Sequence, residues 1–387
     1  MLKGSKTMAQ ENRLKLSGDR FAVVYHLSGS EAEASAKAAD ICLEQTVELP
    51  DELVKDRSIR EEIVGQVVSL RQLQPDLFEA VITFAAETSG FELTQLLNVI
   101  FGNISLQPGI RVERLQLSPS FLEAFRGPRF GREGLRSWLK VPHRPLLCTA
   151  LKPMGMSASE LAELAHRLAL GGIDIIKDDH GLANQPFCPF EERVERCAEA
   201  VARGNRATGL DCIYMPNVTA PVDEVLERAL FAKAVGARGL LISPGLTGFD
   251  TMRRLADDDR VALPLMSHPA FQGSLVTISH AGISHFALFG QMVRLAGADA
   301  SIFPNYGGRF PFKREDCCSL AQGTGCEMGP IKPIFPTPAG GMSLERVPEL
   351  GMVYGREVIF LIGAGLIKHS PNLVENCRYF KQLVEQI

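Results

Sequence analysis

The chain lacks several features that mark other classes of protein. No run of apolar residues reaches the roughly 18 that a membrane-spanning helix needs. The first residues, Met1–Lys6, carry no apolar stretch of the kind found in a signal peptide. The net charge of −4 gives no basic excess, so neither a nucleic acid nor an anionic membrane surface is expected as a partner. Together these absences predict a cytoplasmic protein.

Paired cysteines and a nucleotide fingerprint are also missing. The nine cysteines contain no C-x-x-C pair and lie scattered through strand-like and helix-like segments. A disulfide framework or a zinc site would need paired spacings, so reduced thiols in a cytosolic core are the better interpretation. There is no glycine-rich dinucleotide motif and no low-complexity tract.

From about residue 145 onward, strand-like and helix-like segments alternate regularly. Eight apolar runs have the length of buried strands: Pro145–Thr149, Ile173–Ile176, Cys212–Pro216, Gly239–Ser243, Leu263–Ser267, Ala300–Pro304, Ile331–Pro336 and Val358–Ile362. The first intervening helix begins with a capping box of Ser157 and Glu160, and the last runs from about Ser370. Eight such units predict a closed (β/α)8 barrel. A doubly wound open sheet is the alternative, which the missing nucleotide fingerprint disfavours.

Residues 1–140 have a different rhythm. Strands are predicted at Phe21–Leu27, Gln66–Leu70, Phe78–Phe84 and Ile110–Leu115, and helices at Glu31–Val47 and Leu93–Ile100. We therefore predict a ferredoxin-like α+β domain over residues 1–140, followed by the barrel over residues 141–387. The Gly- and Pro-rich segment Arg126–Gly131 is the predicted junction.

The predicted strand ends carry an unusual set of ionisable residues. In barrels of this kind, the chemistry is carried at the carboxyl ends of the strands. The second strand ends in Lys177–His180, while Lys152 follows the first strand and His268 follows the fifth. A solvated loop is the alternative, but carboxylates at this edge also favour a site for a hard cation such as Mg²⁺. Such a metal beside a bound phospho-sugar would stabilise an enediolate.

Glycines follow the last two predicted strands. Backbone amides without side chains commonly bind phosphate at this place in a barrel, although a single Gly-Gly pair is more often a turn. The candidates for substrate and phosphate binding are Asn217, Arg309, Gly340, Gly341, Gly363, Ala364 and Gly365. A small phosphorylated sugar is the predicted substrate class.

In order and over nearly the whole chain, these segments resemble ribulose-bisphosphate carboxylase large subunits and their non-carboxylating relatives, the RuBisCO-like proteins. Thr149–Pro153 resembles the family's first catalytic lysine segment, Lys177–His180 its metal-site motif, and Asn184–Phe187 the stretch that follows. Ala86–Thr88 and Phe101–Asn103 are similar to segments that reach into a neighbouring subunit's site. The resemblance thus implies a homodimer with shared sites.

The resemblance also implies residue roles. Lys177 would react with CO₂ to form a carbamate, and this carbamate, Asp179 and His180 would bind Mg²⁺. The carboxylases have a glutamate in place of His180, and imidazole suits transition metals better, so another divalent metal or an acid–base role for His180 stays open. Asp178 is expected to be structural. The implied catalytic residues are Lys152, Lys177, His268, Asn103 and Glu87, with Lys152 or the Lys177 carbamate as base.

Carboxylation is not expected of this chain. The second lysine of the family's carboxylases is missing at Met154–Gly155, the long loop after strand six is replaced by Gly307–Phe310, and Ala339 stands in place of a serine. Those groups position CO₂ and stabilise the new carboxylate. Enolisation, the first half of the carboxylase reaction, needs none of them.

The predicted activity is therefore enolisation or isomerisation of a phosphorylated ketose, with 5-methylthioribulose 1-phosphate in methionine salvage as the favoured substrate. One alternative is a 2,3-diketo-5-methylthiopentyl-1-phosphate enolase, although Asn103 stands where that branch carries its basic lysine. A decarboxylase or transcarboxylase acting on 3-oxo-isoapionate 4-phosphate is another alternative. A binding protein without catalysis is disfavoured, because the lysines, Asp179, His268 and both glycine sets are all present.

Overall fold

The computed structural model describes residues 14–387, so Met1–Lys6, where no signal peptide was expected, lies outside the described residues. The chain divides into two compact units. The first comprises the residues up to 110 together with 116–121, and the second comprises 111–115 and 122–387. The predicted domain boundary after residue 140 falls inside the second unit, just beyond α4 (Gly131–Leu139). No helix among residues 14–387 is long and apolar enough to cross a membrane.

The first unit is the predicted α+β arrangement. Its regular elements are β1 (Arg20–Ser28), α1 (Glu31–Glu44), β2 (Gln66–Gln74), β3 (Leu77–Ala85) and α2 (Leu93–Phe101), with short helical turns at Asp51–Leu53, Ile59–Ile63, Ala86–Ser89, Asn103–Leu106 and Pro119–Leu122. Only the two end residues of β4 (Ile110–Gln116) belong to this unit, and the rest of that strand belongs to the second. β3 pairs antiparallel with both β1 and β2. Alternate residues of β3 are buried, from Phe78 to Phe84, as expected of a sheet with one covered face.

The second unit is a closed (β/α)8 barrel, as predicted. Its parallel strands are β5 (Leu146–Leu151), β6 (Ile175–Asp178), β7 (Ile213–Met215), β8 (Leu240–Ile242), β9 (Leu265–Ser267), β11 (Ala300–Pro304), β12 (Phe335–Ala339) and β13 (Ile359–Leu361). They pair in the orders β13-β5-β6-β7 and β8-β9-β11-β12. A bridge between Asn217 and Leu241 and the neighbouring positions of β12 and β13 close the ring.

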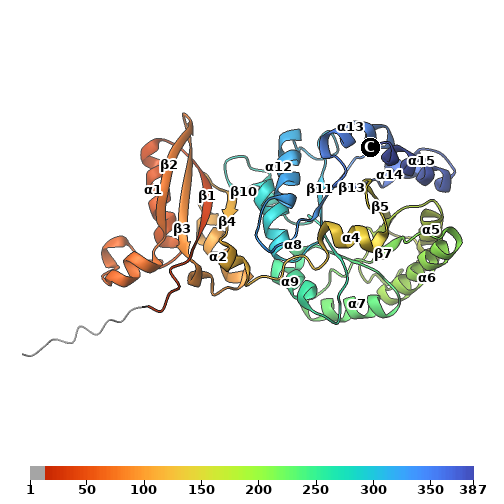
Figure 1. Ribbon diagram of the computed structural model, residues 1–387, viewed down its shortest axis with the longest axis horizontal. Coiled ribbons are helices and arrows are strands. Elements are labelled where there is room, and N and C mark those ends of the chain that lie inside the picture. Colours follow the sequence, from red (N-terminus) through yellow and green to blue (C-terminus); the bar gives the residue numbers. More distant parts are fainter. Residues whose placement is uncertain (1–13) are drawn as a thin grey trace, which may run out of the picture. The chain divides into compact units, whose positions relative to one another are not determined.

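Helices surround these strands, as Figure 1 shows for α5, α6, α7 and α15. The helices are α5 (Ala158–Leu170), α6 (Phe190–Thr208), α7 (Val222–Ala234), α8 (Pro244–Thr247), α9 (Phe249–Asp257), α10 (Gly273–Val276), η5 (Ala287–Met292), α11 (Val293–Leu295), α12 (Arg314–Gly325), α13 (Val347–Tyr354), α14 (Ala364–Lys368) and α15 (Leu373–Glu385). A two-residue strand, β10 (Gly282–Ile283), pairs with Arg111 and Val112 of β4. The predicted capping box of Ser157 and Glu160 is present at the start of α5.

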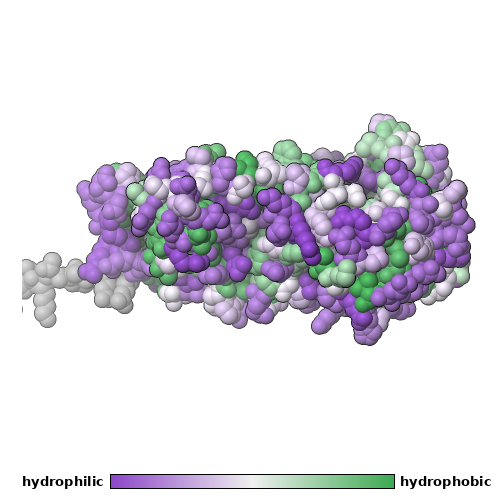
Figure 2. Space-filling model, turned by 90° about the horizontal axis from the view of Figure 1, so that it is seen from above, coloured by the Kyte–Doolittle hydropathy of each residue, from purple (hydrophilic) through white to green (hydrophobic). Residues whose placement is uncertain are grey.

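The barrel interior is filled by side chains. Leu146, Ile175, Met215, Leu241 and Ile302 belong to one buried cluster contributed by strands around the ring. Charged and polar residues cover most of the surface seen in Figure 2, with smaller apolar patches between them. The barrel is therefore a packed core, and any site must lie where the strands end.

The seventh predicted strand begins well inside its predicted range. The apolar run Ile331–Pro336 was expected to be a strand throughout, but β12 starts at Phe335. The reason is Arg294, whose guanidinium is fully buried and binds the carbonyl oxygens of Ile331 and Lys332 at 2.6 and 3.1 Å. These two carbonyl groups therefore accept hydrogen bonds from Arg294 and not from a neighbouring strand.

Candidate active site

The carboxyl ends of the barrel strands surround a cavity of 370 Å³. It brings together side chains that the sequence places far apart. The predicted site residues that line it are Lys152, Lys177, Asp179, His180, His268, Arg309 and Gly340. Gly341, Gly363, Ala364, Gly365 and Asn217 do not line it.

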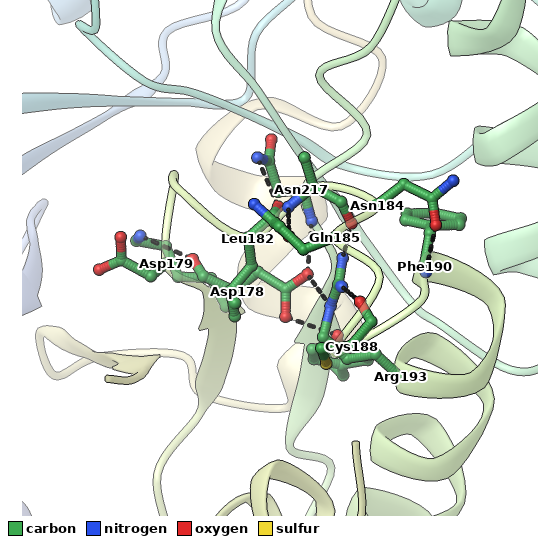
Figure 3. A network of polar contacts seen from close by, with 12 residues as sticks. Asp178, Asp179, Leu182, Asn184, Gln185, Cys188, Phe190, Arg193 and Asn217 are labelled. Atoms are coloured by element: carbon green, nitrogen blue, oxygen red, sulfur yellow. Dashed lines mark hydrogen bonds and ion pairs between the residues drawn. The ribbon is translucent and has the colours of Figure 1, made fainter. Parts of the chain in front are cut away.

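The end of β6 directs neighbouring residues to opposite sides. Because side chains alternate along a strand, Lys177 and Asp179 line the cavity while Asp178 faces away from it. The carboxylate of Asp178 accepts hydrogen bonds from Arg193 Nε at 3.1 Å, from the Tyr214 hydroxyl at 2.6 Å and from the Asn217 amide at 3.0 Å. Figure 3 shows this network, with Asp179 pointing away from it. Asp178 is structural, as expected.

Arg193 organises the loop that carries the site. Its guanidinium has no exposed surface and also donates to the carbonyl oxygens of Cys188 and Ala183. The side-chain amide of Asn217 donates to the carbonyl oxygens of His180 and Leu182 at 3.0 and 2.9 Å (Figure 3). Asn217, predicted to bind substrate, therefore holds the loop after β6 in place. The sequence analysis missed Arg193, since an arginine on an amphipathic helix resembles a surface residue.

Asp179 carries a fixed negative charge in the cavity. Its Oδ2 lies 2.8 Å from Lys152 Nζ, and its Oδ1 accepts from His180 Nδ1 and from the Gly181 amide, both at 3.2 Å. Burial alone would raise the pKa of this carboxyl. The hydrogen bond from His180 and the ammonium of Lys152 outweigh burial and hold the pKa well below its usual range.

Lys177 is the buried lysine of the site. Its side chain is 3% exposed, and Nζ donates to the carbonyl oxygen of Asp178 at 3.0 Å. Burial lowers the pKa of this amine from its ordinary value, because the charged form is poorly solvated there. An uncharged amine has a lone pair, which is what a base or a nucleophile towards CO₂ needs.

His268 and His180 stack on each other, with ring centroids 4.4 Å apart and planes within 11°. The amide of Ala270 donates to His268 Nδ1 at 3.2 Å, so in the neutral ring the proton sits on Nε2. Burial, followed by the positive charge of Lys177, lowers the pKa of His268 well below 6.5. A neutral imidazole with a free Nε2–H can donate a hydrogen bond to a substrate oxygen.

The side chains as they stand do not fit Mg²⁺. Both oxygens of Asp179 already accept hydrogen bonds, and the predicted ligand Lys177 is an amine. Among residues 14–387, no group of three histidine, cysteine, aspartate or glutamate side chains could hold a metal ion. A hard cation prefers several oxygen ligands. The predicted metal site therefore depends on carbamylation of Lys177, which would add oxygen atoms beside Asp179.

The glycines after the last strands have close neighbours. A Cβ on Gly340 would lie 3.2 Å from the ring of Phe310, and one on Gly308 would lie 2.0 Å from the carbonyl oxygen of Gly340. A Cβ on Gly363 would lie 3.7 Å from Lys152 Nζ. Close packing of the two loops after β11 and β12 is thus one reason for the glycines that were predicted to bind phosphate.

Glu87 and Asn103, the two predicted site residues in the first unit, form hydrogen bonds with other residues of that unit. Asn103 Nδ2 donates to the carboxylate of Glu44 at 2.9 Å, and the carboxylate of Glu87 accepts from the Ser17 amide at 2.6 Å. Their roles in a shared active site stay predictions.

Aromatic residues make up much of the remaining cavity lining, and the sequence analysis did not single them out. They are Phe271, Phe289, Phe303, Phe310 and Phe312. Most phenylalanines of a large domain fill its core, so nothing in the sequence marks these five.

Comparison with known proteins assigns the family. The model of the ribulose bisphosphate carboxylase large chain catalytic domain matches residues 132–305. A ribulose bisphosphate carboxylase-like protein 1 of Rhodopseudomonas palustris is 37% identical over 362 residues, covering 94% of this chain and 96% of that protein. The chain belongs to the RuBisCO-like proteins. A crystal structure of a Rubisco-like protein from the same species superimposes with a TM-score of 0.86, covering 95% of this chain and 98% of that one.

Relatives within this family carry names from methionine salvage. A 5-methylthioribulose-1-phosphate isomerase of Rhodospirillum rubrum is 37% identical, covering 94% of this RuBisCO-like chain and 95% of that protein. A 2,3-diketo-5-methylthiopentyl-1-phosphate enolase of Bacillus licheniformis is 31% identical, covering 94% of this chain and 91% of that one. Non-carboxylating enzymes are therefore among the relatives of this chain.

Proposed function

We propose that this RuBisCO-like protein isomerises 5-methylthioribulose 1-phosphate by successive enolisations. The observation that carries the proposal is one cavity that holds a buried lysine, an ion-paired lysine and an imidazole, contributed by Lys177, Lys152 and His268. These groups supply a base and two donors to an oxyanion, which is what enolisation needs. The isomerase from Rhodospirillum rubrum supports the choice of substrate.

The proton transfers follow from the charges of the site. Lys177 is the better base, because burial lowers its pKa while Lys152 Nζ is ion-paired with Asp179 at 2.8 Å. Lys177 takes the proton from the carbon beside the substrate carbonyl, through its amine or, once carbamylated, through a carbamate oxygen. The carbonyl oxygen becomes an enolate oxygen, which the Lys152 ammonium and His268 Nε2–H stabilise. The neighbouring hydroxyl proton is transferred to the enolate oxygen, and the carbon-bound proton returns to the former carbonyl carbon. The carbonyl group thereby moves by one carbon, and a second round moves it further.

The phosphate would bind on the side of the cavity that Arg309 and Gly340 line. A guanidinium can hold a phosphate through two parallel hydrogen bonds. In this arrangement the phosphate fixes one end of the ketose while the lysines and His268 act on its carbonyl region.

Mg²⁺ and the Lys177 carbamate belong to the proposal as separate predictions. The uncharged amine is the form that reacts with CO₂, and burial favours this form of Lys177 by lowering its pKa, which supports carbamylation. Incubation with ¹³C-bicarbonate and Mg²⁺ should give a carbamate signal in ¹³C NMR that disappears in Lys177→Met. A spectrum without this signal under saturating bicarbonate would remove the carbamate from the proposal.

A homodimer with shared sites is proposed from the family resemblance of Glu87 and Asn103. Mixing an Asn103→Ala variant with a Lys177→Met variant should restore part of the activity, because one site in each mixed dimer then has both residues. Verified mixed dimers that stay inactive would contradict shared sites.

Deuterium uptake tests the proposed activity. The protein is incubated in D₂O with 5-methylthioribulose 1-phosphate, Mg²⁺ and bicarbonate, and ¹H NMR follows the protons beside the carbonyl. We expect these protons to exchange and a new pentulose phosphate to appear. Absence of exchange with every divalent metal tried would contradict the isomerase and lead next to the 3-oxo-isoapionate 4-phosphate decarboxylase and then to a binding protein.

The enolase is the second candidate, favoured by the 31% identity to the enolase of Bacillus licheniformis. Asn103, which is hydrogen-bonded to Glu44, stands where that branch has its basic lysine. Turnover of 2,3-diketo-5-methylthiopentyl 1-phosphate faster than the isomerase substrate would reverse our preference.

A further inference from the structure

The cavity has a second wall whose chemistry differs from that of the lysines. Phe289 comes from η5 and Phe312 from the loop that follows β11, and both line the cavity with Val276 of α10. Their ring centroids are 6.5 Å apart, with planes tilted by 39°. We call Phe289 and Phe312 the aromatic wall. It offers a substrate apolar surface and no hydrogen-bond donor.

The aromatic wall is supported from behind by a buried histidine. The His285 ring meets Phe312 edge to face, with centroids 4.6 Å apart, and lies 6.3 Å from the centroid of Phe289. His285 is 6% exposed, and its Nδ1 lies 3.7 Å from the carboxylate of Asp316. The ring of His285 thus backs the aromatic wall with further buried surface.

The cavity lining offers a substrate two kinds of surface. The lysines, Asp179 and His268 suit a polar carbonyl region, and Arg309 with Gly340 suits a phosphate. A flexible polar end would gain nothing from Phe289 and Phe312, whereas an apolar end would be removed from water against two rings.

We propose that Phe289 and Phe312 form a subsite for an uncharged apolar substituent at the substrate end that carries no phosphate. Resting on the proposed function, this inference defines the substrate class as ketose monophosphates ending in a thioether or alkyl group. A hydroxyl end binds more weakly, and a second phosphate is rejected because it would lose its hydration against the two rings.

Ligand binding tests this subsite without requiring turnover. Isothermal titration compares ribulose 1-phosphate, 5-deoxyribulose 1-phosphate, 5-methylthioribulose 1-phosphate and ribulose 1,5-bisphosphate. We expect the methylthio compound to bind about 10- to 200-fold tighter than ribulose 1-phosphate, the range that small apolar groups give in apolar pockets. The deoxy compound should lie between them, and the bisphosphate should bind most weakly.

Variants assign the preference to the aromatic wall. Phe312→Ala should bring the ratio between methylthio and hydroxyl ligands below about threefold, whereas Phe312→Leu, which keeps apolar bulk, should retain most of it. Phe187→Ala is the matched control, since Phe187 is a half-exposed phenylalanine on the loop after β6 that does not line the cavity. Circular dichroism and thermal melting verify that each variant is folded.

The outcomes separate the subsite from the proposed activity. An unchanged ratio in folded Phe312→Ala, or a wild-type protein that binds the bisphosphate best or none of the four ligands, overturns the subsite. A wild-type preference for the methylthio ligand that Phe312→Ala abolishes, together with no deuterium exchange, supports the subsite and contradicts the isomerase.

Discussion

The ionic wall of the cavity, formed by Lys152, Lys177, Asp179, His180 and His268, is held by contacts between charged and polar side chains, whereas the aromatic wall packs on a buried histidine. Lys152, Asp179 and His180 form a chain of contacts at 2.8 and 3.2 Å. Phe289, Phe312 and His285 form a cluster of rings at 4.6 to 6.5 Å. The first wall depends on charge and hydrogen-bond direction, and the second on shape and burial. We therefore expect the ionic wall to control the rate of the chemical step and the aromatic wall to control substrate choice.

The largest effect should come from removing a charge of the ionic wall. Lys152→Ala should lower the rate of deuterium exchange by about 10²- to 10⁴-fold, because an enolate would lose a positively charged donor. The rate constant at saturating substrate, followed by ¹H NMR, measures it. Lys140→Ala is the control, since Lys140 is an exposed lysine paired with Asp211 outside this cavity. Equal rates in the two variants would mean that Lys152 takes no part in the chemical step.

The next largest effect concerns the support of the ionic wall. Arg193→Ala should lower the free energy of unfolding by about 3 to 5 kcal/mol, because the buried carboxylate of Asp178 loses its partner. Arg196→Ala, in the same helix, breaks only an exposed pair with Glu192 and should cost less than about 1 kcal/mol. Urea denaturation compares the two variants. Similar midpoints would show that the remaining hydrogen bonds to the buried carboxylate of Asp178 stabilise it without Arg193.

The pH dependence of stability should come from the ionic wall. The pKa of His268 is lower in the folded protein than the usual 6.5, so below pH 6.5 the unfolded chain takes up a proton that the folded protein does not. The free energy of unfolding should therefore fall as the pH falls, by up to about 1.4 kcal/mol per pH unit from this group.

Urea denaturation at pH 7.5, 6.5 and 5.5 checks this sign. The difference in the free energy of unfolding between the wild type and His268→Gln should shrink or reverse as the pH falls, because the variant lacks the titrating ring. A difference in free energy that stays constant with pH would contradict the role of His268 in this pH dependence. Phe312→Ala should show the same pH dependence as the wild type.

The smallest effect tests the loop packing beside Arg309. Gly340 has a φ of +77°, and Gly209 has a φ of +73° with no atom within 4 Å of an added Cβ. Alanine at either position should lower the free energy of unfolding by about 1 kcal/mol through backbone strain. Only Gly340→Ala should also change ligand affinity, by a few fold, because its Cβ displaces Phe310. Identical titration curves for the two variants would show that Phe310 does not shape the site.

The two walls also differ in how far the sequence predicts them. The run Lys177–His180 after an apolar strand is unusual, and it led to five cavity residues before the fold was known. Phe289 and Phe312 lie in segments whose apolar residues fit an ordinary core, and the chain has 21 phenylalanines. Charged groups at buried strand ends are costly and therefore conspicuous, whereas an apolar group carries no such mark.

Asn217 and the glycines illustrate the same limit. Their types and positions at strand ends predicted contact with substrate. Asn217 lies outside the cavity lining and binds two carbonyl groups of the loop after β6, whereas Gly340 lines the cavity and also allows the ring of Phe310 to approach. A polar or small residue can serve a neighbouring loop as well as a ligand, and only the packing of that loop distinguishes the two.

The sequence by itself determined the eight strand–helix units, the ends of most strands and the ionisable residues at the cavity. Hydrophobic periodicity and capping are local, so they can be read within ten to twenty residues. The tertiary structure alone decided that Lys152 pairs with Asp179, that Arg193 is buried against Asp178, and that Phe289 meets Phe312. Each of these contacts joins separate elements, and closure of the barrel selects them through the shape and charge of the groups brought together.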